Sequence, residues 1–103
     1  MKYKLFITDE ADADIDEILH YIADTLSNKK AATAFADELD HQYEQLMDHP
    51  YLFEESRDTK LRKVGYRRFI VGNYVGLYLV DEEKHSVTIA RIFYGRRNYS
   101  KYI

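Results

Sequence analysis

Residues 66–94 read YRRFIVGNYVGLYLVDEEKHSVTIARIFY, and this stretch decides the fold. It holds three runs rich in β-branched and aromatic residues, at 66–71, 75–80 and 86–94. Gly72 and Asn73 predict a tight turn between the first two runs, and the polar residues 81–85 predict another turn after them. Because short turns join antiparallel neighbours, the stretch predicts a three-stranded antiparallel meander.

The segment before the meander predicts a strand followed by a helical hairpin. Residues 2–7 alternate lysines with apolar side chains, which is the period of a half-buried strand. Thr8 is a good helix N-cap, and apolar residues then recur at helical spacing at Ala11, Ile15, Ile18, Ile22 and Leu26. Asn28 can cap a second helix that runs to about Asp48, before Pro50. The short connection predicts that the two helices lie antiparallel.

Two further stretches complete the expected architecture. The acidic residues of the first helix lie off its apolar stripe and lack the spacing of a calcium loop, so we expect a solvated face at Asp12, Asp14, Asp16 and Glu17. Residues 51–60 have no clear period and predict a surface loop. The expected fold is α+β: an N-terminal strand, an antiparallel helical hairpin and a three-stranded antiparallel meander, with the helices packed on one face of the sheet.

Strand parity predicts apolar side chains on both faces of the sheet. In the last strand, Val87, Ile89 and Phe93 are expected to share a face with Arg91, and Ile92 is expected on the other face. Two helices can cover only one face of such a sheet. We therefore expect the other face to be an exposed apolar patch or the binding site of a partner.

Length and composition set the class of protein. A chain of 103 residues predicts a single domain that spans 1–103. It contains no cysteine, so we expect neither a disulfide framework nor a thiolate zinc site. It also has no secretory segment and no long apolar run, so we expect a cytoplasmic protein without a membrane partner.

Charge is distributed unevenly along the chain. Residues 1–55 hold 4 Lys and Arg against 14 Asp and Glu, a net charge of −10, whereas residues 56–103 hold 11 against 4, a net charge of +7. The overall charge of −3 therefore hides a basic half. Phosphate is bound by local patches of charge, so this asymmetry leaves an anionic partner open.

Metal and nucleophile motifs give no candidate site. The four histidines show no ligand spacing, and the serines lack the glycines of a nucleophile elbow, so we predict no metal and no cofactor. What remains is a group of cations with interleaved tyrosines: Arg62, Lys63, Arg67, Arg68, Arg91, Arg96, Arg97 and Lys101. The arginines either pair with the acidic helices of the same chain or form a groove that binds a polyanion and stabilises phosphoryl transfer.

The order of these elements, with residues 61–99 (LRKVGYRRFIVGNYVGLYLVDEEKHSVTIARIFYGRRNY), resembles the RelE/ParE superfamily of toxins from type II toxin-antitoxin modules. The resemblance covers essentially the whole chain. It includes AAxxF in the second helix, a GYR strand, a GNY turn and a closing RIxxGRRxY. It implies a β-α-α-β-β-β fold of the RelE/ParE type.

The resemblance implies two possible activities, because this superfamily carries both on one fold. The RelE branch cuts mRNA in the ribosomal A site with arginines, lysines and a tyrosine, whereas the ParE branch poisons DNA gyrase and is not a nuclease. Ribosome-dependent, metal-independent mRNA cleavage is the leading expectation, and gyrase inhibition is the alternative. Either activity implies a hetero-oligomer with a cognate antitoxin, with the ribosome and mRNA, or DNA gyrase, as the target.

The resemblance also implies site residues. Arg96 matches the RelE-type arginine after the last strand, and Tyr102 matches the C-terminal tyrosine of that branch. The expected catalytic residues are Arg67, Arg91, Tyr94, Arg96 and Tyr102. The residues expected to bind nucleic acid are Arg62, Lys63, Arg68, Tyr74, Arg97 and Lys101. Two positions depart from the pattern, because Tyr74 replaces an arginine of the RelE branch and Tyr94 replaces a histidine of related toxins.

Overall fold

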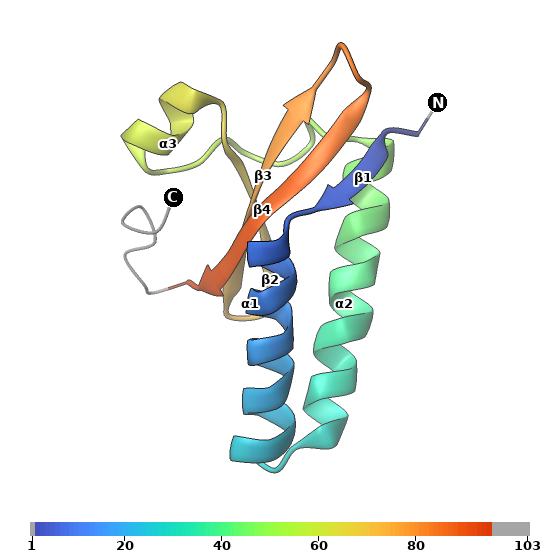
Figure 1. Cartoon of the computed structure of the whole chain (residues 1–103), viewed down its shortest axis with the longest axis vertical. Coiled ribbons are helices and arrows are strands. Elements are labelled where there is room, and N and C mark those ends of the chain that lie inside the picture. Colours follow the sequence, from blue (N-terminus) through green and yellow to red (C-terminus); the bar gives the residue numbers. More distant parts are fainter. Residues whose placement is uncertain (1, 96–103) are drawn as a thin grey trace.

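The computed structural model describes residues 2–95 and contains one mixed four-stranded sheet (Figure 1). The strands are β1 (Lys4–Ile7), β2 (Arg67–Val71), β3 (Tyr74–Asp81) and β4 (Ser86–Tyr94). The sheet order is β1-β4-β3-β2, with β1 parallel to β4 and the other neighbours antiparallel. The helices α1 (Asp9–His20) and α2 (Lys29–Asp48) pack on one face, so the expected RelE/ParE-like α+β fold is confirmed.

The two helices of the hairpin begin at the expected caps, but the first does not continue as an α-helix up to Leu26. The side chain of Thr8 accepts a hydrogen bond from the Ala11 backbone N–H (3.0 Å), and Asn28 caps α2 in the same way. After α1 the chain forms a π-helical turn, η1 (Tyr21–Thr25), in which the Leu26 N–H donates to the Tyr21 carbonyl. Such turns often lie at functional sites. Within residues 2–95, no helix is long and apolar enough to cross a bilayer.

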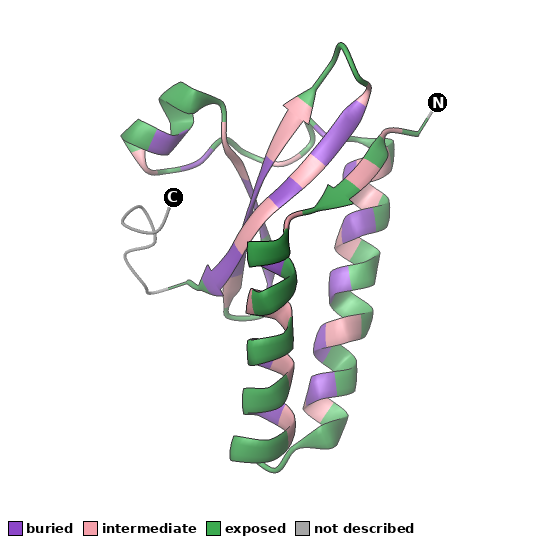
Figure 2. Cartoon of the chain, viewed as in Figure 1, coloured by how far each residue is buried: buried purple, intermediate pink, exposed green. Residues whose placement is uncertain are grey.

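The main core lies between the hairpin and the sheet, where the buried residues in Figure 2 line the inward sides of the helices and the centre of the sheet. Helical side chains such as Phe35, Leu39 and Leu46 pack there against Phe69 and Tyr78 from the strands. Gly76 lies opposite Phe69 in the register, and a Cβ at position 76 would overlap the Phe69 ring. The absence of a side chain on β3 at this position therefore makes room for the Phe69 ring of β2.

A β-bulge in β4 overturns the expected parity of that strand. Leu77 pairs with Arg91 while Tyr78 pairs with Ile89, so Ala90 is an extra residue without a partner on β3. Ile92 consequently joins Ile89 in the core beneath the helices, and Phe93 lies in a second cluster with Val75, Leu77 and Leu61. The prediction that Ile89 and Phe93 share a face was wrong because strict alternation cannot anticipate a bulge.

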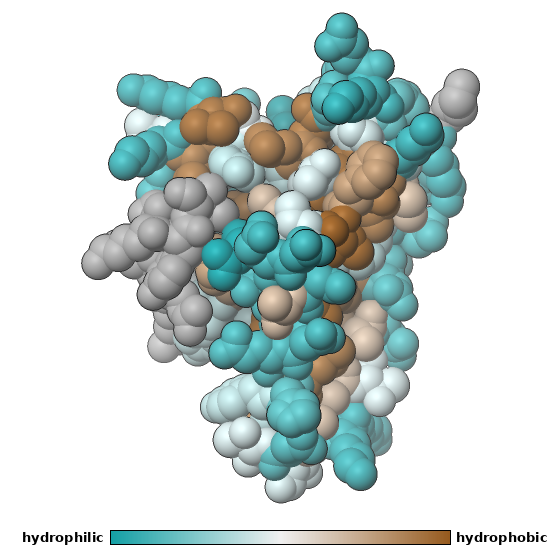
Figure 3. Space-filling view, viewed as in Figure 1, coloured by the Kyte–Doolittle hydropathy of each residue, from teal (hydrophilic) through white to brown (hydrophobic). Residues whose placement is uncertain are grey.

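The second cluster includes a helix that was not predicted. Helix α3 (Thr59–Val64) is capped at its start by Asp58, whose side chain accepts from the Leu61 N–H, and at its end by Gly65, which has a φ of 111°. Leu61 packs on the side of the sheet opposite α1 and α2. Part of the face that was expected to be bare or bound to a partner is thus covered by this chain itself. Figure 3 shows apolar surface beside α3 and also along the seam between α1 and α2, whereas the front of α1 is hydrophilic.

The free side of β2 is closed by the segment before α3. The Arg68 N–H donates to the Glu54 carbonyl (3.0 Å), and the Ser56 N–H donates to the Tyr66 carbonyl (2.9 Å). Glu55 and Arg67 form an isolated antiparallel bridge at the same place. The predicted surface loop is therefore partly an extended backbone that pairs with an edge strand.

Candidate functional site

The structure disperses the predicted arginines. Arg67 and Arg68 are neighbours on β2 and project to opposite faces of the sheet. The Arg67 guanidinium donates to the Phe53 carbonyl (2.8 Å) and lies 4.9 Å from the centre of the Tyr51 ring. Arg68 is buried and lies 3.4 Å from the Glu54 carboxylate. Both arginines therefore contact acceptors of their own chain.

Arg91 on β4 forms a two-pronged ion pair with Asp14 of α1. Its Nε donates to Asp14 Oδ2 (2.8 Å) and its Nη2 donates to Asp14 Oδ1 (3.0 Å). These hydrogen bonds raise the pKa of Arg91 above its ordinary value. The side chain of Asp14 is only 12% exposed, so the prediction that Asp14 belongs to a solvated face was wrong. Its place three residues after Ala11 and four before Ile18 was the available signal, because that spacing flanks the apolar stripe.

Arg62 and Lys63 lie in the last turn of α3, where both are exposed. This position is on the opposite side of the sheet from the helical hairpin, away from Asp14 and its ion pair. Four further predicted residues lie outside the described residues: Arg96, Arg97, Lys101 and Tyr102.

Tyr74 and Tyr94 are the predicted site residues that the structure brings together. They are direct partners on β3 and β4, and their ring centroids lie 5.8 Å apart in an edge-on arrangement. Tyr74 also packs edge-on against Phe35 of α2 at 5.4 Å, and burial raises the pKa of its hydroxyl. Tyr94 is 42% exposed. The pair thus has one ring anchored in the core and one at the surface.

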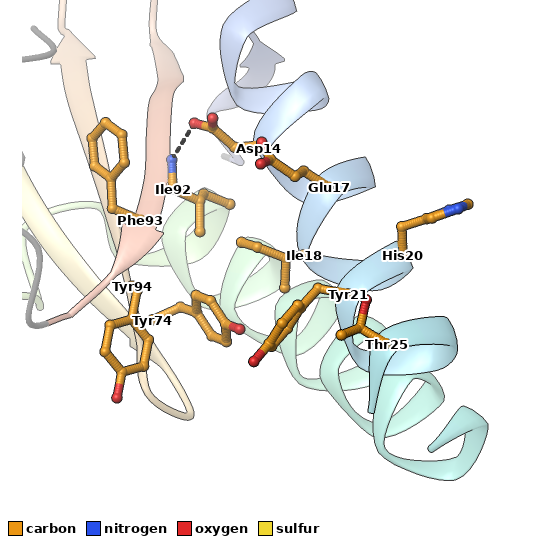
Figure 4. Close-up of a pocket in the computed structure, with 10 residues that line it drawn as sticks. All are labelled: Asp14, Glu17, Ile18, His20, Tyr21, Thr25, Tyr74, Ile92, Phe93 and Tyr94. Carbon is orange, nitrogen blue, oxygen red and sulfur yellow. Dashed lines mark hydrogen bonds between the residues drawn. The ribbon is translucent and has the colours of Figure 1, made fainter. Parts of the chain in front are cut away.

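A hollow of about 640 Å³ opens beside this tyrosine pair, between α1, η1 and the ends of β3 and β4 (Figure 4). In Figure 4 the rings of Tyr21 and Tyr74 point toward one another across its floor, while Tyr94 points away from Ile18 and Ile92. The other lining side chains include three that carry titratable groups: Asp14, Glu17 and His20. The described lining is therefore mainly aromatic and apolar, with Glu17 beside an Asp14 carboxylate that Arg91 already pairs, whereas the predicted site was basic.

Tyr21 was missed by sequence reasoning, and the structure places it at the start of the π turn with a side chain that lines the hollow. A continuous α-helix was expected through Leu26, and no residue pattern marks where an α-helix widens into a π turn. Among residues 2–95, no group of three or more metal-binding side chains lies close enough to hold a metal ion. The described part of the site consequently offers aromatic and hydrogen-bonding surface, which suits binding of another molecule.

A separate cluster joins the turn between β3 and β4 to two other parts of the chain. The hydroxyls of Tyr3 and Tyr51 both donate to Oε1 of Glu82, at 2.5 and 2.6 Å. These two hydrogen bonds hold the pKa of Glu82 below its usual value, and the same contact raises the pKa of Tyr51 to about 12. Arg67 stacks on the other side of this cluster, over Tyr51.

Comparison with known proteins identifies the family. A family model described as the ParE toxin of the type II toxin-antitoxin system parDE matches residues 5–99. The chain therefore belongs to the ParE toxin family of type II toxin-antitoxin systems. No curated protein matches the chain in sequence.

Solved structures share the fold of this chain. The RelBE2 toxin-antitoxin complex of Mycobacterium tuberculosis has 22% identity and a TM-score of 0.60, over 91% of this chain and 99% of that chain. A chromosomal ParDE system of P. aeruginosa has 21% identity and a TM-score of 0.66, over 88% and 94%. The archaeal RelE-RelB complex of Pyrococcus horikoshii has 16% identity and a TM-score of 0.54, over 94% and 99%. Both branches of the superfamily share this fold, so fold alone does not separate nuclease from gyrase inhibitor.

Proposed function

We propose that this ParE-family toxin acts by binding DNA gyrase rather than by cutting RNA. The observation that carries the proposal is the dispersal of Arg67, Arg68 and Arg91, each of which contacts an acceptor of its own chain. Arg67 and Arg68 project to opposite faces of the sheet and Arg91 is held by Asp14 of α1, whereas phosphoryl transfer needs cations gathered around one phosphate. The match to the ParE toxin model favours the same branch.

The hollow beside α1 is the surface that we assign to target binding. Exposed tyrosines are enriched at protein interfaces because they combine a large apolar ring with a hydrogen-bonding hydroxyl. Tyr21 and Tyr94 are about half exposed, at 48% and 42%, and Glu17 lines the same hollow. A protein surface that presents basic and apolar side chains would complement this arrangement.

We assign neutralisation to a small cognate antitoxin that binds the other side of the molecule. Val64 and Ile70 are 65% and 46% exposed, and Arg62 and Lys63 precede Val64 on α3. The similar solved structures from M. tuberculosis and P. horikoshii are toxin-antitoxin complexes. An Ile70→Lys variant should escape neutralisation by the co-expressed antitoxin while remaining toxic, and full neutralisation would contradict this location.

DNA supercoiling by purified gyrase tests the target. The toxin should inhibit supercoiling, and Tyr21→Ala should weaken that inhibition by roughly tenfold, as expected for loss of an interface aromatic residue. Tyr51→Ala is the matched control, because Tyr51 is similarly exposed but lies outside the hollow. If the two variants inhibit gyrase equally, the hollow is not part of the target-binding surface.

Ribosome-dependent mRNA cleavage is the second candidate, and one observation favours it. Tyr94 is partly exposed at the end of β4, just before the basic segment 96–103. Primer extension on transcripts from cells that express the toxin distinguishes the two functions. Discrete cuts within codons, with no effect on gyrase, would overturn the gyrase proposal.

A further inference from the structure

Strand β4 extends beyond the end of its neighbour β1. Thr8 and α1 contact the part of β4 that has no neighbouring strand on this side. β1 ends at Ile7, which pairs with Ile89, while β4 continues to Tyr94. Beyond this point the Thr8 N–H donates to the Ile89 carbonyl (3.1 Å) and the Thr8 hydroxyl donates to the Ala90 carbonyl (2.8 Å). Two backbone acceptors of β4 are thus satisfied by a single residue at the start of α1.

Asp14 continues this role six residues further along the chain, on α1. Its Oδ2 accepts from the Ile92 backbone N–H (3.0 Å), as Figure 4 shows, in addition to the two hydrogen bonds from Arg91. The carboxylate therefore binds both the side chain of one residue and the backbone of the next. The two side chains are 12% and 22% exposed, so little water is available to replace these bonds.

The bulge at Ala90 gives these contacts a specific consequence. Because Ala90 has no partner on β3, the strand could shift by one residue unless something fixes the segment that follows. Asp14 fixes it at Ile92, and on the other side Gly95 donates to the Asn73 carbonyl (2.8 Å). Between these two points lies Tyr94, which is in register with Tyr74.

We propose that Asp14 is the positioning residue of the toxin site. It holds the end of β4 in register after the bulge, so that Tyr94 stays beside Tyr74. Asp14 and Arg91 act as one unit, which we call the clamp. Arg91 acts through Asp14, and its role is to position the end of β4 rather than to contact the target. This inference rests on the proposed function only in assigning activity to the end of β4.

Amide hydrogen exchange measured by NMR tests the clamp directly. Asp14→Asn keeps the shape of the side chain but is neutral and carries an NH₂ group in place of one carboxylate oxygen, so it cannot accept all three hydrogen bonds that Asp14 accepts from Arg91 and the Ile92 N–H. The Ile92 amide should exchange roughly tenfold faster, as expected when a hydrogen bond to a charged group is lost, while amides in α2 stay protected. Asp16→Asn is the matched control, because it makes the same charge change on an exposed position of α1. Unchanged protection at Ile92 in Asp14→Asn would overturn the proposal.

A second variant covers the case in which Asp14→Asn does not fold. Arg91→Lys keeps a cation beside Asp14 but cannot form the two-pronged contact, so the carboxylate is held less firmly. Exchange at Ile92 should rise by a few-fold, roughly in line with one lost hydrogen bond. No rise at Ile92 in this variant would count equally against the clamp.

A double-mutant cycle on target inhibition separates positioning from contact. Asp14→Asn and Arg91→Gln should each weaken inhibition by a similar factor, and the double variant should be no weaker than either, because both break one unit. If Arg91 touches the target independently, the two losses will multiply, and the positioning role is wrong. If the wild-type chain has no effect on gyrase, the proposed function fails, whereas the exchange result at Ile92 still decides the clamp.

Discussion

Two margins of the sheet, the outer side of β2 and the part of β4 that extends beyond β1, are closed by different kinds of contact. At β2 the neighbour is extended backbone, since residues 54–56 exchange main-chain hydrogen bonds with Tyr66 and Arg68. At β4, beyond the end of β1, the neighbour is a helix that uses the side chains of Thr8 and Asp14. Backbone pairing tolerates most side chains, whereas the closure at β4 depends on the identity of two residues. The free energy of unfolding should therefore be more sensitive to substitutions at the β4 margin than to substitutions at the β2 margin.

Arg91→Met should give the largest loss. It leaves Asp14 mostly buried without its cation, and breaking such a pair typically costs roughly 3 kcal/mol in the free energy of unfolding. Urea unfolding followed by circular dichroism measures this change. A loss below about 1 kcal/mol would indicate that the ion pair behaves like an exposed one.

Thr8→Val should have the next largest effect. It removes the hydroxyl that caps α1 at Ala11 and donates to the Ala90 carbonyl, while the shape of the side chain is kept. We expect a loss of about 2 kcal/mol, from the cap together with the unsatisfied carbonyl. Thr33→Val is the control, since Thr33 is exposed within α2 and its hydroxyl bonds only the preceding turn. Equal losses in the two valine variants would remove the special role of Thr8.

Arg68→Met should be neutral or slightly stabilising, which is the opposite of Arg91→Met. Arg68 is buried beside β2, its Nε has no hydrogen-bond partner among the described residues, and its contact with Glu54 is 3.4 Å. Replacing a poorly satisfied buried cation by an apolar side chain of similar length changes stability by about 0 to +1 kcal/mol. The melting temperature measures this, and toxicity measured in parallel shows whether Arg68 contacts the target. A fall of several degrees in the melting temperature would mean that Arg68 stabilises the margin at β2 as Arg91 stabilises the margin at β4.

The pH dependence of stability should show the smallest effect. It concerns the cluster of Tyr3, Tyr51 and Glu82. Glu82 accepts from Tyr3, which precedes β1, and from Tyr51, which lies on the segment leading to β2. Because these bonds lower the pKa of Glu82 in the folded state, their contribution is present above the ordinary carboxyl pKa and is lost as pH falls through the lowered value. The melting temperature should fall less steeply between pH 5 and pH 3, roughly the carboxyl range, in a Tyr3→Phe, Tyr51→Phe double variant than in the wild type. Identical slopes would contradict this role for Glu82.

Most of the architecture was predictable because it depends on local signals. The strands of the meander, the turn at Gly72 and Asn73, and the caps at Thr8 and Asn28 were recognisable from residue type and spacing. Helix α3 was missed because its six residues are too few to show an apolar period, although Asp58 and Gly65 are suitable cap residues.

Other unpredicted features depend on contacts between distant segments. The bulge at Ala90 and the partner of Asp14 follow from how α1 lies beside β4, which no short spacing encodes. The predicted basic site is likewise divided by tertiary structure, since neighbouring arginines on β2 must project to opposite faces. Tyr74 and Tyr94 were named from a family resemblance, and their contact became visible only with the strand register.

The pairing of β1 with β4 has a consequence for the order of synthesis. Each residue of β1 pairs with one that is 82 positions later, as Lys4 with Ser86 and Ile7 with Ile89. Contacts between such distant segments form late and slow the folding of small domains. On a translating ribosome, β1 can find its partner strand only after residues 86–89 have left the exit tunnel. The sheet therefore cannot be completed until β4 has emerged, and β1 has no strand partner while the helices, β2 and β3 are being made.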